Sequence, residues 1–369
     1  MLFSRYSTNF FAIWWRSLDK LIVLSLIALI VISIFFSYVS TYSIASTKLY
    51  NDSSILFKKH LIFMTLGILG LIIFSIFNEQ FLKNYSYVFF LITSIMLISV
   101  FFIGIEVKGA KRWIEISNFR IQPVEFIKPF YILYISKFIC DEDVKKIKYF
   151  FSGLITFFLI FFLISQPDYS QSLILLMIWF ILMFISGINF VLIFFISIFS
   201  VSIITSALFL FKEKFLYIFN RLDVWANSSL TSFQSQKALN AIKNGGFFGQ
   251  GIGEGNLKSK VPEAHTDYVL AVIAEEFGIV AIIIIILIFL ILALRVFSIS
   301  QNNNDKFRKI TLIGLISTIL LQTLINLGVT INILPTTGIT FPLFSYGGSS
   351  LISSLIIFGL ILNLTRKRI

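Results

Sequence analysis

The sequence predicts an all-α integral membrane protein, a single domain over 1-369 that crosses the bilayer about ten times and carries one long extracytoplasmic loop at 212-266. Of its 369 residues, 57% are hydrophobic and only 13% are charged, whereas a soluble domain carries about 25% charged residues. The mean hydropathy is +0.93. At about 20 apolar residues per spanning helix, this composition supplies roughly ten spans. It excludes a water-soluble enzyme, a disordered chain and a nucleic-acid-binding domain.

The apolar runs give the order of the spans. We expect them at 21-43, 60-77, 85-105, 122-140, 148-165, 172-187, 189-211, 267-296, 309-333 and 342-364. The first run follows Arg5, Arg16 and Lys20 and is also typical of a signal peptide, with a cleavage-like Ser43-Ile44-Ala45. We prefer an uncleaved helix, because the run is longer than the apolar core of a signal peptide.

Positive charge predicts the orientation. An even number of spans places both termini in the cytoplasm, and Arg366-Lys367-Arg368 then obeys the positive-inside rule. The expected inner connections carry basic residues as well: Lys137, Lys145, Lys146, Lys148, Arg295, Lys306, Arg308 and Lys309. We therefore expect a multi-pass membrane protein with both ends in the cytoplasm.

The expected outer side carries positive charge that the rule does not explain. A short connection holds Lys108, Lys111, Arg112 and Arg120, and the segment 212-266 holds seven more Lys or Arg. Short external loops normally lack such residues because they oppose insertion, although long loops translocate regardless of charge. The compact cluster indicates a site for an anionic group at the outer surface.

Acidic residues gather before the eighth span. Pro262-Glu-Ala-His-Thr-Asp-Tyr268 places three ionisable groups at the outer mouth of this helix. Either Thr266 or Asp267 could be its N-cap, and Asp267 is also a candidate for catalysis. Glu275 and Glu276 follow about two turns deeper, where a carboxylate is costly unless it is paired or functional. One of them could hold a basic residue of another helix.

A second polar cluster opens the fourth span at Gln122-Pro-Val-Glu-Phe-Ile-Lys128. Glu125 and Lys128, at i and i+3, share a helix face just below the outer surface. They form either a local ion pair that stabilises the helix end or part of a cationic pocket with Lys111-Arg112-Trp113. Such a pocket beside carboxylates suits a substrate with a phosphate-bearing leaving group and a hydroxyl nucleophile.

Other polar motifs are less specific. We expect Asp168 to cap the next helix, and we expect Gln322 and Asn326 to form interhelical hydrogen bonds. The small residues at 345-350 predict close helix packing. The glycines at 244-255 allow either a tight fold or approach to a ligand. With two His and one Cys a structural zinc site is excluded, while Mg²⁺ or Mn²⁺ held by carboxylates and a pyrophosphate stays open.

Together these motifs resemble those of the shape, elongation, division and sporulation (SEDS) family over nearly the whole chain. The matching segments are Gly109-Ala-Lys-Arg-Trp-Ile114, Gln122-Pro-Val-Glu-Phe-Ile-Lys128, Gln166-Pro-Asp168, Pro262-Glu-Ala-His-Thr-Asp267, Leu334-Pro-Thr-Thr-Gly338 and Pro342-Leu-Phe-Ser-Tyr-Gly-Gly-Ser-Ser350. The stretch Gly253 to Gly278 is most similar to the cell-division branch. Val124 stands where Ser is common and Thr337 where division members often have Lys, which keeps the elongation branch as second choice.

The resemblance implies a peptidoglycan glycosyltransferase that polymerises lipid II at the outer face of the inner membrane, at the division septum. It implies a class B penicillin-binding transpeptidase and other divisome membrane proteins as partners. The family's essential acid falls on Asp267, the expected catalytic base. The implied substrate-binding residues are Lys111, Arg112, Trp113, Gln122, Glu125, Lys128, His265 and Ser349. An α-linked donor and a β-linked product imply a single inverting displacement, without organic cofactor.

Two other functions use the same residues. A flippase for the lipid-linked precursor would bind the same anionic headgroup, with carboxylates relaying protons. A scaffold would position a transpeptidase through its helices and should tolerate Asp267→Asn. We favour the polymerase, because the distinctive polar residues crowd at the outer surface and the inner connections offer no matching acidic and basic pocket.

Overall fold

Helices occupy nine of the ten predicted spans. The computed structural model describes residues 9–45, 54–107, 109–117, 119–141, 147–189, 233–255 and 261–367, with a few single positions between 191 and 257. The helices at the predicted spans are α2 (Lys20–Ala45), α3 (Ser54–Ile76), α5 (Ser86–Ile103), α6 (Pro123–Cys140), α7 (Ile147–Ser165), α8 (Tyr169–Ile185), α12 (Val269–Gln301), α13 (Lys306–Thr330) and α14 (Gly348–Leu364).

Within these described ranges, six helices are long and apolar enough to cross a membrane, and α8 and α14 are shorter apolar helices. The expected span at 189-211 and the first part of the loop at 212-266 lie outside the described residues. The polytopic helical fold is therefore confirmed, while the count of ten and the single long loop stay predictions.

Four further elements were not predicted. Three are the short helices α1 (Phe10–Ser17), α4 (Glu79–Asn84) and α11 (Phe233–Gly245). The fourth is an antiparallel sheet in the order β1 (Gly104–Val107), β2 (Ala110–Ile116) and β3 (Phe119–Ile121), where Ile114 pairs with both Gly104 and Ile121. The segment that carries the outer basic cluster, which the sequence predicted only as a short connection, is thus a small sheet.

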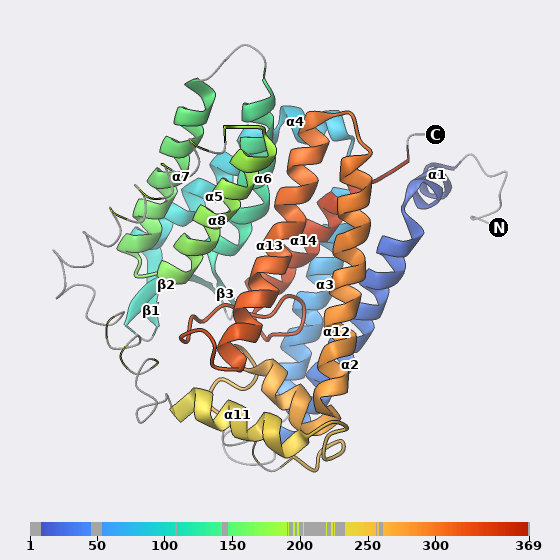
Figure 1. The fold of residues 1–369 in the computed structure, drawn as a ribbon, viewed down its shortest axis with the longest axis vertical. Helices are drawn as coiled ribbons and strands as arrows, with labels where there is room; N and C mark the ends of the chain where they lie inside the picture. The colour runs from blue at the N-terminus through green and yellow to red at the C-terminus, as the bar shows by residue number, and fades with distance from the viewer. Residues whose placement is uncertain are drawn as a thin grey trace.

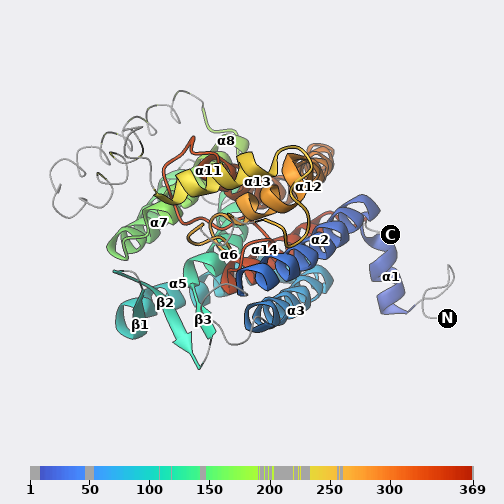
Figure 2. The ribbon, with the colours of Figure 1, turned by 90° about the horizontal axis from the view of Figure 1, so that it is seen from below.

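The elements define two ends of the molecule. The long helices run side by side, with the sheet and α11 at one end and α1, α4 and the C-terminal end of α14 toward the other (Figures 1 and 2). We call the end with the sheet and α11 the outer end, and the opposite one the inner end. The backbone N–H of Lys367 donates to Ser17 O at 2.9 Å, so the two chain ends meet at the inner end.

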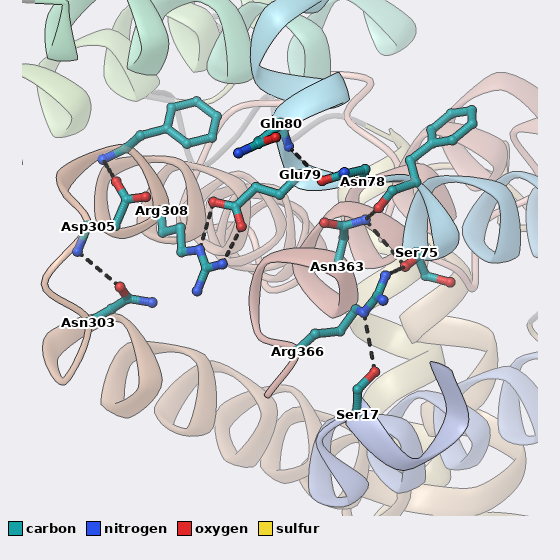
Figure 3. A network of polar contacts seen from close by, with 12 residues as sticks. Ser17, Ser75, Asn78, Glu79, Gln80, Asn303, Asp305, Arg308, Asn363 and Arg366 are labelled. Atoms are coloured by element: carbon teal, nitrogen blue, oxygen red, sulfur yellow. Dashed lines mark hydrogen bonds and ion pairs between the residues drawn. The ribbon is translucent and has the colours of Figure 1, made fainter. Parts of the chain in front are cut away.

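A polar network ties the inner ends of several helices together (Figure 3). Arg308 Nε donates to Glu79 Oε1 at 2.7 Å, and its Nη2 donates to the other carboxylate oxygen. The Asn363 amide donates to three carbonyl oxygens at the end of α3, at 2.6 to 3.3 Å. Arg366 reaches Ser17 Oγ at 3.3 Å. The bonds of Asn363 satisfy carbonyl groups that a helix end leaves without partners.

Small residues let α14 pack closely, as the sequence predicted. A Cβ at Gly348 would lie 2.5 Å from the ring of Phe63 on α3, and one at Gly359 would lie 2.6 Å from Leu71 O. In a membrane, small residues bring helix backbones close enough for van der Waals contact along their length. These two glycines therefore let α3 lie directly against α14.

The glycine-rich loop packs on a break in α12. Gly278 has φ +76°, outside the helical region, and interrupts the helix. Across this break Ile279 N donates to Gly246 O at 3.0 Å, and Gln250 N donates to Glu275 O at 2.8 Å. A Cβ at Gly249 would overlap the Glu276 carbonyl. Of the two interpretations that the sequence left open for the glycines, the tight fold describes this loop.

Candidate functional site

Asp267 lies in a turn at the outer end, directly before α12. The amide groups of Thr266 and Asp267 donate to Glu263 O at 3.0 and 3.2 Å. The helix begins only at Val269, with Tyr268 at the N-cap position. The expectation that Thr266 or Asp267 caps this helix is therefore wrong, because their amides close a separate turn. The Asp267 side chain is half-buried.

The turn is held by α13 and by the loop 331–347. Asn326 Nδ2 donates to Asp267 O at 3.0 Å and to Ile339 O at 2.7 Å. Ser345 Oγ donates to Thr266 O at 2.5 Å. The predicted hydrogen bonding of Asn326 exists, but its acceptors are loop carbonyls and not a second helix. These bonds fix the backbone from which the Asp267 carboxylate projects.

The loop 331–347 connects Asp267 with the basic region. A Cβ at Gly338 would lie 3.9 Å from Asp267 Oδ2, so the carboxylate faces this part of the loop. One residue earlier, Thr337 O accepts a hydrogen bond from Ser170 Oγ at 2.7 Å. Ser170 opens α8 two residues after Asp168. A chain of contacts thus links the turn at Asp267, the loop 331–347 and the start of α8 at the outer end.

Arg112 extends this chain of contacts onto the sheet. Its Nε donates to Gln166 O at 3.2 Å, its Nη2 donates to Pro167 O, and its Nη1 lies 3.8 Å from Asp168 Oδ1. Because Ile105 pairs with Trp113 and Glu106 with Lys111, Arg112 is the extra residue of a β-bulge in β2, a feature that redirects a side chain. Lys111 is exposed and Trp113 half-buried. Of the predicted basic cluster, Arg112 therefore contacts the turn before α8, whereas the Lys111 side chain is exposed.

Asp168 joins three elements of the site. It occupies the N-cap position of α8 as predicted, but its side chain makes no cap hydrogen bond. Instead Oδ2 accepts from Gln122 Nε2 at 3.2 Å, while Arg112 lies beside Oδ1. Burial raises the pKa of the Asp168 carboxyl, and the positive charge of Arg112 opposes this shift. The carboxylate acts as a junction between β2, α6 and α8.

Glu125 and Lys128 form the predicted pair, deep inside the bundle. Lys128 Nζ lies 2.7 Å from Glu125 Oε2, and the two side chains are only 1% and 3% exposed. Gln171 closes a ring, because its Nε2 donates to Glu125 Oε1 at 2.8 Å and its Oε1 accepts from Lys128 at 3.1 Å. Gln171 was not among the predicted residues. Its spacing of three from Asp168, one helical turn, is the signal that could have identified it.

Three other predicted residues make bonds that position the outer helix ends. Ser349 Oγ accepts from the Gln122 backbone N–H at 2.8 Å and is buried. His265 O accepts from Tyr346 N at 2.7 Å, and the rings of these two residues meet edge to face at 6.0 Å. These contacts bring the fourth, eighth and tenth predicted spans together at the outer end.

Glu275 fastens the glycine-rich loop. Its buried Oε1 accepts from Asn244 Nδ2 at 3.1 Å and from Leu257 N at 2.8 Å. The sequence suggested a basic partner from another helix for Glu275 or Glu276, but the donors to Glu275 are amides. A Cβ at Gly255 would lie 3.0 Å from the carboxyl carbon of Glu275. Glu275 therefore supports the segment that leads to Asp267.

Among the residues that the structure describes, no three or more His, Cys, Asp or Glu side chains are grouped to hold a metal ion. The carboxylates of the outer end are distributed over separate hydrogen-bonding networks. Since Mg²⁺ takes only one or two protein carboxylates at sites where phosphates and water supply the other ligands, the donor set at Asp267 fits a substrate-borne ion better than a resident one.

Comparison with known proteins covers nearly the whole chain. The profile of the FtsW/RodA/SpoVE family, described as "Cell cycle protein", matches residues 19–369. A probable peptidoglycan glycosyltransferase FtsW from Geobacter sp. (strain M18) is 30% identical over 336 residues, which cover 89% of this chain and 91% of the relative. The protein of the same name from Borreliella burgdorferi is 32% identical over 361 residues, with 95% and 98% coverage.

Solved structures share the fold. One comes from work on the structural coordination of polymerization and crosslinking by a peptidoglycan synthase complex, with a TM-score of 0.79, 24% identity and coverage of 95% of this chain and 98% of that one. The rod shape determining protein RodA of Thermus thermophilus gives a TM-score of 0.70 at 24% identity, with 95% and 97% coverage. The likeness to these structures shows the common arrangement of helices.

Proposed function

The chain belongs to the FtsW/RodA/SpoVE family of cell cycle proteins, and we propose that it is a peptidoglycan glycosyltransferase that polymerises lipid II into glycan strands. The observation that carries this proposal is the chain of contacts at the outer end that runs from Asp267 through Gly338, Thr337 and Ser170 to the turn that Arg112 holds. It offers a carboxylate and cations at one end of a membrane bundle, where a lipid-linked substrate has access from the bilayer.

The reaction needs two kinds of group. A sugar hydroxyl attacks the anomeric carbon of the donor, so a base must accept its proton, and positive charge must stabilise the departing undecaprenyl-pyrophosphate. We assign Asp267 as the base and Lys111 and Arg112 to the pyrophosphate. One displacement inverts the configuration from an α-linked donor to a β-linked product, which requires no covalent intermediate.

The buried ring of Glu125, Lys128 and Gln171 supports the site from below. Because its three side chains satisfy one another in the interior, we assign Lys128 and Glu125 to positioning rather than to contact with pyrophosphate. They fix the start of α6, whose Gln122 bonds to Asp168. A Mg²⁺ or Mn²⁺ ion carried by the pyrophosphate would add positive charge at the leaving group, with Asp267 as its nearest candidate ligand.

Charge supports an orientation with the inner end in the cytoplasm. Basic residues of the described inner end include Arg16, Lys137, Lys148, Arg295 and Lys306, and such residues are retained on the cytoplasmic side during insertion. The site then faces the outer leaflet of the inner membrane. We propose a class B penicillin-binding transpeptidase as partner and the septum, with its other divisome membrane proteins, as the location.

The test is polymerisation of lipid II by the purified full chain in liposomes, with and without the transpeptidase. We expect Asp267→Asn to lose glycan synthesis by at least about a hundredfold, the usual contribution of a general base, while partner binding is retained. Glu254→Gln, which neutralises an exposed carboxylate of the same outer region, should keep wild-type activity. Equal synthesis by Asp267→Asn and wild type would refute the assignment.

A further inference from the structure

A cavity at the inner end is not explained by the polymerase reaction. It has a volume of 380 Å³ and lies where α1, α2, the C-terminal half of α12 and the chain after α14 meet. Its lining residues are Arg16, Leu18, Asp19, Lys20, Leu21, Arg295 and Lys367. The volume lies within the range of small-molecule binding sites, about 300 to 1,000 Å³. The sequence predicted no matching acidic and basic pocket in the inner connections, whereas this cavity at the helix ends contains both kinds of residue.

The lining carries an excess of positive charge. Four basic side chains face a single carboxylate, that of Asp19. Asp19 is already engaged, because its Oδ2 accepts from Arg295 Nη2 at 2.7 Å and its Oδ1 accepts from Ile22 N at 3.2 Å. Within the described residues neither Lys20 nor Lys367 forms an ion pair with a carboxylate. The cavity lining therefore carries more positive than negative charge.

The same cavity has apolar lining residues, and the helices that form it expose further hydrophobic side chains. Leu18 and Leu21 belong to the lining. On the adjoining helices, Leu24 of α2 is 67% exposed, and Phe10 and Phe11 of α1 are 59% and 57% exposed. Aromatic and basic side chains gather where the headgroups of a bilayer meet its acyl chains. We call these hydrophobic residues the apolar border. A soluble anion has no apolar part that could contact it.

The elements around the cavity are fixed to each other. Lys20 Nζ donates to Trp15 O at 2.5 Å and lies 4.4 Å from the Trp15 ring, which joins α1 to α2. Lys367 N donates to Ser17 O at 2.9 Å, which joins the C-terminal segment to α1. The backbone segments that carry the basic side chains are thus already fixed before a ligand binds. This lowers the entropy lost on binding.

We propose that this cavity binds the phosphate of an anionic phospholipid from the inner leaflet, with the acyl chains of the lipid along the exposed apolar residues of α1 and α2. The cations supply the attraction to the phosphodiester, and the apolar border distinguishes a lipid from soluble phosphate. The site lies at the end opposite Asp267 and does not depend on the polymerase assignment.

Native mass spectrometry of the full chain, purified in detergent and stripped of lipid, tests this. The protein is titrated with phosphatidylglycerol, with phosphatidylcholine and with phosphatidylglycerol in the presence of inorganic phosphate. The pocket variant combines Lys20→Gln and Lys367→Gln. The control variant combines Lys148→Gln and Lys306→Gln, which removes two charges from the same end outside the cavity lining.

We expect the pocket variant to bind the first phosphatidylglycerol roughly twenty-fold more weakly, since each basic residue contributes about a fivefold factor, and the control to stay within about twofold of wild type. Equal weakening in both variants, or equal wild-type affinity for phosphatidylcholine, overturns the proposal. Displacement of the lipid by millimolar phosphate would assign the cavity to a soluble anion instead.

The Lys20 side chain also bonds to α1, so the substitution of Lys20 could disrupt the contact between α1 and α2. If the pocket variant is not monodisperse, Lys367→Gln alone is compared with Lys306→Gln, because the bond that Lys367 makes to Ser17 is a backbone bond and survives the substitution. About fivefold weaker binding of phosphatidylglycerol in Lys367→Gln supports the proposal, and no difference between the two refutes it.

Discussion

Replacing Lys128 by Met should destabilise the protein more than replacing Lys128 and Glu125 together. Met has nearly the length of Lys, so the single substitution removes charge with little change in packing. It leaves the Glu125 carboxylate, 3% exposed, with Gln171 as a neutral donor at 2.8 Å. A buried charge without its counter-ion is the main cost of breaking such a pair.

The magnitude follows from the burial of both groups. Removing one partner of a buried ion pair costs about 3 to 5 kcal/mol, whereas replacing both by neutral groups of similar shape is close to neutral. Lys128→Met should therefore lose about 4 kcal/mol, and Lys128→Met with Glu125→Gln about 1 kcal/mol. At about 2 °C per kcal/mol for a chain of this size, the single variant should melt roughly 8 °C below wild type and the double variant roughly 2 °C below it.

Thermal unfolding of the purified variants in one detergent measures this order directly. Lys137→Met, on the same helix but near the inner end and half-buried, is the control and should shift the melting temperature by about 1 °C or less. A double variant that melts below the single Lys128→Met variant would refute the reasoning, since it would show that the uncompensated carboxylate is not the source of the loss.

Three further substitutions are informative. Gly278→Ala should lower the melting temperature far more than Gly187→Ala, since both glycines have positive φ but only at Gly278 would a Cβ overlap a loop carbonyl; equal shifts in thermal unfolding would contradict this. Asn326→Leu, which removes the donor to Asp267 O, should reduce kcat for glycan synthesis about tenfold with little change in KM, and a pure loss of stability with unchanged kcat would argue against positioning. Asn363→Leu removes the side-chain donor to Phe74 O and Phe77 O, while Ser75 O keeps Arg366 as a donor, and it should cost about 1 to 3 kcal/mol in denaturant unfolding, whereas wild-type stability would show that other donors replace it.

The spans could be predicted because apolar length alone determines them. The start of α6 agrees to within a residue, since Pro123 at the first helical position marks it. The sheet could not be predicted in the same way. Its strands are short, and their pairing depends on a turn around Gly109, where φ is +78°, and on a register that no local pattern specifies.

In the site, too, contacts within one helix could be predicted, whereas contacts between segments far apart in the sequence could not. The i, i+3 spacing predicted the Glu125–Lys128 pair, and the motif at 166–168 was recognised as polar and close to the outer surface. The sequence could not predict which of these side chains are in contact. The contacts of Gln171 with α6 and of Arg112 with the turn before α8 require the packing of helices that are separated by more than 40 residues, and the sequence gives no measure of that packing.

The break in α12 also decides how this helix fits the bilayer. At 1.5 Å per residue, an unbroken helix of 33 residues would be about 50 Å long, well beyond the roughly 30 Å of hydrocarbon. The part after Gly278 is about 35 Å long, close to the membrane thickness with a modest tilt. The loop supplies acceptors for the amides that the break exposes. The part of α12 before Gly278 therefore does not need to match the thickness of the hydrocarbon. The stretch that follows Asp267 is therefore free of hydrophobic mismatch, and its orientation is set by the loop instead of by lipid.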